Sequence, residues 1–312
     1  MTVRIDQYVR HAARPEWGPG RVLDFRGGRV TVYFRDVEGD DPKEALKVFK
    51  TDFSGLTDAG IASDAILDNL PPYKDGQFER LPRKRVTLEE GRGKFHSLFP
   101  MYFEDPRYVG DLKAGERAYK WAAHELFVET LGNGRLDALV TNGDIEEATR
   151  RVRAVAGRVN LLSMFEAAAF RDGLEAEGPA RAFYRALIGL LARGPVSRAA
   201  FEDLVAALEG LPSEEGKSDP AKWPVVTLLP YLADPRRFMF LKPNVTKDCA
   251  ARLTFDLKYS PQLNWVTYSK LLEMSHYLLE YLTPYGAVDF IDVQSFIWVI
   301  GGGWDDADST VS

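Results

Sequence analysis

The sequence predicts an α+β protein in which a small N-terminal β-barrel precedes a larger all-α domain. Residues 1–60, here called the β module, contain short runs of β-branched and aromatic residues. Glycine- and proline-containing turns separate these runs about every ten residues, a pattern typical of a small barrel. After residue 87, hydrophobic residues recur at spacings of three and four, which is the period of a helix face.

Composition limits the function classes that the chain can belong to. At 312 residues the chain has room for about two domains. A hydrophobic content of 45% excludes global disorder, and a net charge of −6 excludes a wholly basic nucleic-acid coat protein, although not a local basic patch. A single cysteine, Cys249, excludes an intramolecular disulfide framework and a multi-cysteine zinc site. The histidines lie far apart in the sequence, so no metal site is predicted. No cofactor and no catalytic residue is predicted either.

A tight hairpin is expected within the β module. Residues 21–25 and 30–34 are rich in β-branched and aromatic side chains, and Gly27 and Gly28 lie between them. A Gly-Gly pair supplies the positive φ angles that a two-residue hairpin turn needs. Hydrophobic residues alternate along the second run, as in a half-buried strand, and residues 44–49 predict a further strand.

The rest of the chain is predicted to be helical. Residues 61–86 predict a linker that carries a basic segment, residues 87–304 a helical domain, and residues 305–312 a frayed tail. Thr87 and Glu90 have the spacing of a capping box, which predicts that the first helix of this domain begins there.

Three segments of the β module carry a resemblance to known domains. Residues 8–11 (YVRH), 15–22 (PEWGPGRV) and 28–34 (GRVTVYF) together look like a bacterial SH3/Tudor-like module. The run is similar to the DUF3553-type domain, to the Tudor-like C-terminal segment of UvrD/PcrA helicases and, more distantly, to the RNA-polymerase-interacting barrel of CarD proteins. The resemblance covers residues 5–56, and it implies a barrel that docks on RNA polymerase and brings no catalytic residues. The helical remainder is not assigned to a family.

Motifs that would point to an enzyme are weak. The sequence has no Gly-x-Ser-x-Gly elbow and no His-Glu-x-x-His, and His124 fits a half-buried structural histidine. Asp256 and Lys258 have the Asp-x-Lys spacing of metal-dependent nucleases, in which a carboxylate holds Mg²⁺ and the lysine steadies the attacking water. A solvated charged pair explains the same pattern, so a nuclease or defence-type enzyme is an alternative hypothesis.

A basic segment at the end of the linker is the clearest candidate for nucleic-acid binding. Several phosphate contacts from lysine and arginine can dominate nucleic-acid affinity. The candidate residues are Arg80, Arg83, Lys84, Arg85, Arg92 and Lys94. A solvated linker or a cluster of helix-capping charges is the alternative interpretation.

The β module also combines arginine with aromatic residues. Guanidinium groups pair with phosphate or carboxylate, and aromatic faces stack on bases or anchor protein partners. The residues predicted to bind a partner are Arg10, Trp17, Arg21, Tyr33 and Arg35. The alternative is that Trp17 and the other rings form the barrel core.

These observations predict a non-enzymatic accessory or adaptor protein of nucleic-acid metabolism. The β module would dock on a protein partner such as RNA polymerase, or on nucleic acid, and the basic segment would add phosphate contacts. A protein-interaction scaffold without a nucleic-acid role is a further alternative, beside the nuclease. The first residues do not resemble a secretory signal, and no apolar run approaches the roughly 20 residues of a membrane span, so a cytoplasmic protein is expected.

Overall fold

The computed structural model describes residues 3–79, 84–110, 115–213 and 218–303. The chain divides into two compact units, and each is described by itself. Unit 1 comprises residues 1–98, 244–257 and 296–312, and unit 2 comprises residues 99–243 and 258–295. Unit 1 therefore contains the β module together with segments that follow it at much higher sequence numbers, whereas the boundaries predicted from sequence follow chain order.

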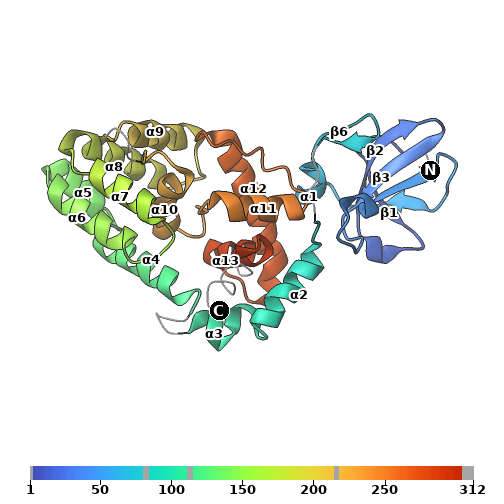
Figure 1. The fold of residues 1–312 in the computed structure, drawn as a ribbon, viewed down its shortest axis with the longest axis horizontal. Helices are drawn as coiled ribbons and strands as arrows, with labels where there is room; N and C mark the ends of the chain where they lie inside the picture. Colours follow the sequence, from blue (N-terminus) through green and yellow to red (C-terminus); the bar gives the residue numbers. More distant parts are fainter. Residues whose placement is uncertain (1–2, 80–83, 111–114, 214–217, 304–312) are drawn as a thin grey trace. The chain divides into compact units, whose positions relative to one another are not determined.

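A five-stranded antiparallel sheet forms the β module (Figure 1). Its strands are β1 (Tyr8–His11), β2 (Gly20–Arg26), β3 (Arg29–Phe34), β4 (Leu46–Lys50) and β5 (Leu56–Asp58), in the spatial order β4-β3-β2-β1-β5. The α+β prediction is confirmed, but the barrel is not closed. The edge strand β4 pairs only with β3 and the edge strand β5 only with β1, so the described strands form an open sheet.

The predicted hairpin is present between β2 and β3. Gly27 and Gly28 have φ angles of 58° and 72°, which places both residues in the left-handed region that a two-residue turn of this kind requires. A bulge between Val22 and Asp24 shifts the register, so that Phe25 pairs with Val30 and Arg26 with Arg29. The bulge thus decides which side chains of β2 share each face of the sheet.

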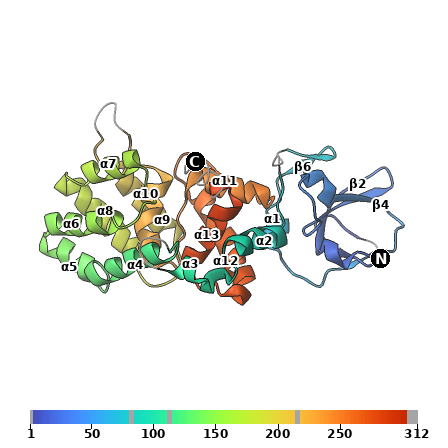
Figure 2. The ribbon, with the colours of Figure 1, turned by 60° about the horizontal axis from the view of Figure 1, so that its bottom comes forward.

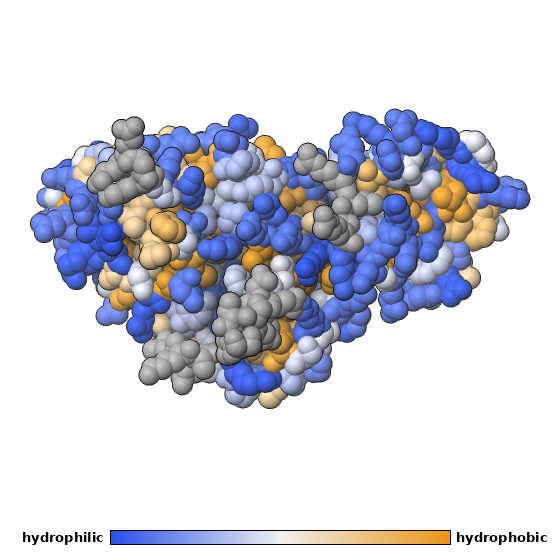
Figure 3. Space-filling view, viewed as in Figure 1, coloured by the Kyte–Doolittle hydropathy of each residue, from blue (hydrophilic) through white to orange (hydrophobic). Residues whose placement is uncertain are grey.

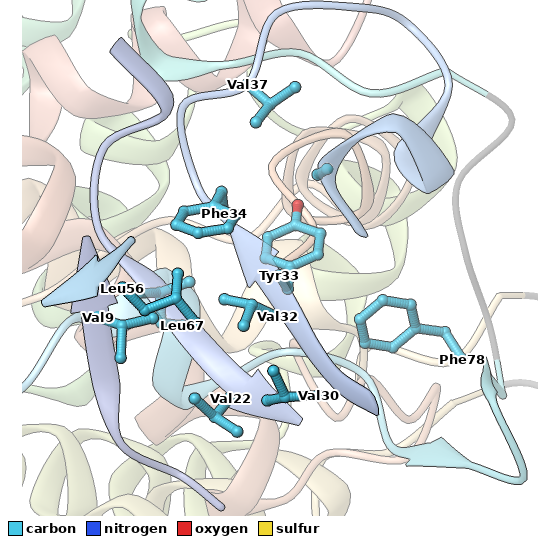
Figure 4. Close-up of a cluster of buried hydrophobic side chains, with 11 residues drawn as sticks. Val9, Val22, Val30, Val32, Tyr33, Phe34, Val37, Leu56, Leu67 and Phe78 are labelled. Atoms are coloured by element: carbon cyan, nitrogen blue, oxygen red, sulfur yellow. The ribbon is translucent and has the colours of Figure 1, made fainter. Parts of the chain in front are cut away.

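The core of the β module is built from valines and rings (Figure 4). Val22 of β2 and Val32 and Phe34 of β3 have no exposed surface, and the burial of Val32 and Phe34 follows the alternation predicted along β3. Full burial of such a side chain contributes about 1.5–3 kcal/mol to folding. The Tyr33 side chain points to the opposite face of the sheet. It is nevertheless only 1% exposed, because further parts of unit 1 cover that face at this point.

Short elements and parts of three helices complete unit 1. The short elements are η1 (Pro15–Trp17), η2 (Pro42–Ala45), α1 (Ala65–Asp68), β6 (Tyr73–Lys74) and β7 (Gln77–Phe78), and the helices are α2 (Leu88–Leu98), α11 (Pro243–Arg252) and the end of α13 (Phe290–Ile300). The predicted capping box is confirmed at α2. The Thr87 N–H donates to Glu90 Oε2 at 2.6 Å, and the Glu90 N–H donates to Thr87 Oγ1 at 3.1 Å.

Unit 2 is helical (Figure 2). Its further elements are η3 (Tyr102–Glu104), α3 (Pro106–Val109), α4 (Ala118–Thr130), α5 (Arg135–Asn142), α6 (Ile145–Ala156), α7 (Met164–Gly173), α8 (Glu177–Leu191), α9 (Arg198–Glu209), α10 (Trp223–Ala233), α12 (Trp265–Leu282) and η4 (Thr283–Tyr285). Helix α8 packs against α5, α6 and α9, and α10 packs against α4, α7, α8 and α9. Among the described residues, no helix has the length and apolar character needed to cross a membrane.

Candidate functional site

An aromatic cluster on the β module is the strongest candidate for a binding surface. It comprises His11, Trp17, Phe34, Phe49 and Phe53, which come from β1, η1, β3, β4 and the loop after β4. The ring centroids of His11 and Trp17 are 4.8 Å apart, and those of Trp17 and Phe34 are 5.4 Å apart. The rings of Phe49 and Phe53 stack at 5.0 Å with an interplanar angle of 15°.

The aromatic cluster runs from the core to the surface. Phe34 has no exposed surface, Trp17 and Phe49 are half-buried against the core, and Phe53 is 39% exposed. Figure 3 shows hydrophobic side chains among hydrophilic ones on the face of the β module that it displays. Large rings held by a rigid core and reaching solvent lose little conformational entropy when they bind, which is the usual character of an anchor in an interface.

Positive charge lies over the ring of Trp17. Lys47 Nζ is 4.9 Å and Arg14 Cζ is 6.0 Å from the Trp17 ring centroid. Arg14 also pairs with Glu16 at 3.5 Å, but both of those side chains are more than half exposed, so this pair is weak. Rings bordered by cations suit a ligand that offers both a flat face and negative charge.

Two of the five residues predicted to bind a partner are available at the surface. Arg10 is exposed on β1, and Trp17 belongs to the aromatic cluster. Arg21 donates to Asp6 Oδ1 at 2.8 Å and to the Leu67 carbonyl at 2.7 Å. These bonds hold Arg21 to residues of unit 1.

Arg35 and Tyr33 are likewise engaged inside unit 1. The Arg35 guanidinium donates to both carboxylate oxygens of Asp36, at 2.7 and 2.8 Å, and also bonds the buried carboxylate of Asp64. Tyr33 is buried and donates to Thr254 Oγ1 at 2.9 Å. For Tyr33 the structure therefore matches the core alternative that the sequence left open.

The predicted basic segment does not form one exposed positive stripe in the described residues. Arg80 and Arg83 lie outside them. Arg85 is only 2% exposed, and its guanidinium donates to the Tyr33 hydroxyl at 3.0 Å and to the carbonyl oxygens of Val37 and Arg35. Arg85 is thus a structural cation of unit 1, because no phosphate can reach a guanidinium that is enclosed in this way.

The remaining basic residues have acidic neighbours. Arg92 pairs with Glu89, and Lys84 pairs with Asp40 at 3.1 Å. Lys84 and Lys94 line the same pocket of about 350 Å³, in which Arg252, Asp40 and Glu90 also take part. The structure thus brings two of the predicted residues together, and two carboxylates offset most of the positive charge of that pocket.

The nuclease alternative gains no supporting geometry from the described residues. Residues 255–258 form neither helix nor strand, and no group of three or more histidine, cysteine, aspartate or glutamate side chains in the described parts of the chain is arranged to hold a metal ion. His124 is half-buried, as predicted, with Nδ1 2.8 Å from the Leu232 carbonyl oxygen. Burial raises the pKa of the Cys249 thiol well above its usual range, which disfavours a reactive thiolate.

A buried ionic network in unit 2 was not predicted. Arg117 bonds both oxygens of Asp289, at 2.9 and 2.6 Å, and Asp292 Oδ1 at 2.7 Å. Asp289 and Asp292 are 2% and 1% exposed.

The Tyr108 hydroxyl donates to Asp292 at 2.7 Å, and the fully buried Lys120 donates to Glu116 at 2.8 Å. The one signal in the sequence is the placement of Asp292 in a helix whose side chains are mostly apolar.

Burial governs ionisation in this network. It raises the pKa of Asp292, and the charge of Arg117 only partly opposes that rise. Burial also lowers the pKa of Lys120, although the nearby Glu116 carboxylate acts in the opposite direction. Every charged group here has an oppositely charged partner, which is how folded proteins accommodate buried ions. Removal of one partner from such a network would leave a buried charge without compensation.

One comparison with known proteins gives a match. Residues 6–39 match the family model described as "Protein of unknown function (DUF3553)". No curated protein and no solved structure matches the chain. The family match confirms the resemblance of the N-terminal segment to the DUF3553-type domain, and it covers β1, β2 and β3 with the hairpin between them.

Proposed function

We propose that this chain is a non-enzymatic accessory protein of nucleic-acid metabolism whose β module docks on nucleic acid or on a nucleic-acid-associated protein such as RNA polymerase. The observation that carries the proposal is the aromatic cluster, in which the half-buried Trp17 ring lies under Lys47 and Arg14 and the Phe53 ring reaches solvent. The resemblance of residues 5–56 to docking modules supports the same role.

The geometry favours binding over catalysis as the task of the β module. Phe53 stacks on Phe49, so its orientation is set before any partner arrives and little freedom is lost on docking. Lys47 and Arg14 add positive charge that steers an acidic partner toward the rings. The same arrangement provides no nucleophile paired with a base.

The test compares two double variants of the full chain. The cluster variant, Phe53→Ser with Lys47→Gln, alters the aromatic cluster at its exposed end. The α7 variant, Met164→Ser with Phe165→Ser, is the control, because it removes apolar side chains of α7 that are 76% and 68% exposed. Binding is measured by fluorescence anisotropy with labelled single-stranded oligonucleotides and by biolayer interferometry with purified RNA polymerase.

The cluster variant is expected to lose at least about tenfold in affinity for the partner that the chain binds, as is usual for an interface anchor, with an unchanged unfolding temperature. The α7 variant is expected to bind like the unaltered chain. Equal losses in both variants, or no binding of either probe by the unaltered chain, would overturn the proposal. Binding to RNA polymerase alone would assign the docking role to a protein partner.

A further inference from the structure

We propose that a cross-strand row of cations on the β module, formed by Arg26, Arg29 and Lys50, binds the sugar-phosphate backbone of single-stranded nucleic acid. Phenylalanine rings on the opposite face of the same end of the sheet would stack on the bases. This inference rests on the proposed function and names the ligand class and the surface.

Strand register defines the row. Arg26 of β2 pairs directly with Arg29 of β3, and Arg29 pairs directly with Lys50 of β4. Directly paired residues of antiparallel strands point to the same face, and neighbouring strands lie about 4.8 Å apart. Three cationic side chains on three adjacent strands therefore leave the same face of the sheet side by side. All three residues are exposed.

The positive charge of the row exceeds the acidic charge around it. Arg26 lies 3.7 Å from Asp24 and 3.3 Å from Asp75, and Asp75 is 90% exposed. Arg29 and Lys50 form no ion pair within 4.0 Å with any residue that the structure describes. Like charges in direct cross-strand pairs repel one another. An anionic ligand that bridges the row would relieve this repulsion, which gives the row a specific preference for extended negative charge.

The tip of the β2–β3 hairpin, formed by Gly27 and Gly28, carries no side chain. Cβ atoms built on Gly27 and Gly28 would meet no atom within 4 Å, and the positive φ angles of both residues disfavour larger side chains. The backbone at the tip is therefore bare. A ligand that reaches the hairpin tip therefore meets main-chain atoms and no Cβ atom at Gly27 or Gly28.

Aromatic rings lie on the other face of the same end of the sheet. Phe25 pairs with Val30, and Val30 pairs with Phe49, so this row alternates with the cationic row and lies on the core face of the sheet, where Val30 is only 1% exposed. Phe25 is 36% exposed, and Phe53, which stacks on Phe49, is 39% exposed. Exposed rings next to a cationic groove or row are the usual components of a site for single strands, since every base offers a flat face for stacking.

The combination favours a single strand over a duplex and over an acidic protein. A duplex offers phosphates but hides the faces of its bases, so the phenylalanine rings would add nothing. An acidic peptide offers carboxylates without flat ring systems. Arginine also suits phosphate because its planar guanidinium can bond two oxygens at once. Nothing in the row reads a 2′-hydroxyl, so DNA and RNA single strands are expected to bind alike.

The test measures the salt dependence of binding by the full chain. The probes are labelled oligothymidylate and oligouridylate of about 20 nucleotides, with a matched duplex and a polyglutamate peptide as competitors. Each phosphate contact to a single strand contributes about 0.7 to the slope of log affinity against log salt, so three contacts give a slope of about −2. Affinity should then fall about 20-fold between about 50 and about 200 mM salt.

Two triple variants separate the row from net charge. The row variant combines Arg26→Gln, Arg29→Gln and Lys50→Gln and removes the row. The unit 2 variant removes the same charge from exposed positions of unit 2 and combines Arg158→Gln, Arg193→Gln and Lys222→Gln. The row variant should reduce the magnitude of the slope by about 2, and the unit 2 variant should leave it unchanged. Arg26→Lys with Arg29→Lys should keep the slope, because the charge is retained.

An unchanged slope in the row variant would overturn this inference, as would equal competition by the duplex or by polyglutamate. If the row variant binds single strands normally while the Phe53→Ser, Lys47→Gln variant has lost its partner, the inference fails and the proposed function remains. Far-ultraviolet circular dichroism and the unfolding temperature of each variant establish that the sheet is intact, so that a loss of binding is assigned to the row.

Discussion

Arg85 Nε donates a hydrogen bond to the Tyr33 hydroxyl at 3.0 Å, and the Arg85 side chain lies 5.7 Å from the centre of the Tyr33 ring. The Tyr33 hydroxyl in turn donates to Thr254 Oγ1, a residue 221 positions away in the sequence. One tyrosine of β3 thus joins the β module to two later parts of unit 1. Both Tyr33 and Arg85 are buried, so this relationship belongs to the stability of the unit.

Tyr33→Phe is expected to destabilise the protein without weakening ligand binding. The change leaves the Arg85 Nε–H and the Thr254 hydroxyl without their shared partner inside the fold. Loss of a buried hydrogen bond to a charged group costs about 1.5–3 kcal/mol. Urea unfolding followed by circular dichroism measures this loss. Tyr73→Phe, at a half-buried position on β6, is the control and should change stability by less than about 0.5 kcal/mol.

Arg117→Met is expected to be the most damaging single change in the ionic network of unit 2. It leaves Asp289 and Asp292 buried without a cation, although they are 2% and 1% exposed. Removing one partner of a buried ion pair costs about 3–5 kcal/mol. The free energy of unfolding in urea, compared between the variant and the unaltered chain, gives the value directly.

Lys120→Met provides the contrast within the same network. Lys120 is fully buried and its charge is disfavoured there, whereas its partner Glu116 is 25% exposed and can be solvated when left alone. The methionine fills a similar volume, so the change is expected to cost less than about 1 kcal/mol or to stabilise the protein. A loss as large as that of Arg117→Met would show that Lys120 and Arg117 act as one unit.

The features that the sequence predicted correctly depend on neighbouring residues. The β2–β3 hairpin follows from the Gly27-Gly28 pair and the alternation on each side of it, and the start of α2 follows from Thr87 and Glu90 three residues later. Each of these signals lies within a few residues of the structure that it specifies, so a single sequence is enough to find it.

The features that were missed depend on residues far apart in the chain. Nothing around Arg85 distinguishes it from Lys84, yet Arg85 is buried and Lys84 exposed, because segments that come much later in the chain also pack in unit 1. The network of unit 2 joins Arg117 to Asp289, 172 positions away. The barrel was predicted from short strands, from turn spacing and from the resemblance to an SH3/Tudor-like module, whereas closure depends on whether the edge strands β4 and β5 meet.

Phe53→Ala and Phe34→Ala are expected to separate binding from folding within the aromatic cluster. Phe34 is fully buried, and its truncation should cost about 3–5 kcal/mol of stability. Phe53 is 39% exposed, so its truncation should cost less than about 1 kcal/mol and yet weaken docking. Thermal unfolding and oligonucleotide anisotropy on the same samples measure both quantities. A large stability loss in Phe53→Ala would mean that this ring is core and not an anchor.

Glu147→Gln is expected to remove part of the acid dependence of stability in unit 2. Hydrogen bonds from Arg150, at 2.6 and 2.7 Å, and from Arg151, at 2.6 Å, lower the pKa of Glu147 from 4.5 to about 2. A carboxylate whose pKa is lower in the folded state stabilises the fold above pH 4.5, and this contribution disappears as the pH falls toward 2.

The unaltered chain should therefore unfold at a higher temperature than Glu147→Gln at neutral pH, and the difference should shrink steadily on acidification through that range. Glu202→Gln is the matched control, because Glu202 bonds a single arginine, Arg198, at 2.8 Å. It should show a smaller difference at neutral pH. A difference for Glu147→Gln that stays constant down to pH 2 would assign its effect to packing or helix propensity and not to the charge of the carboxylate.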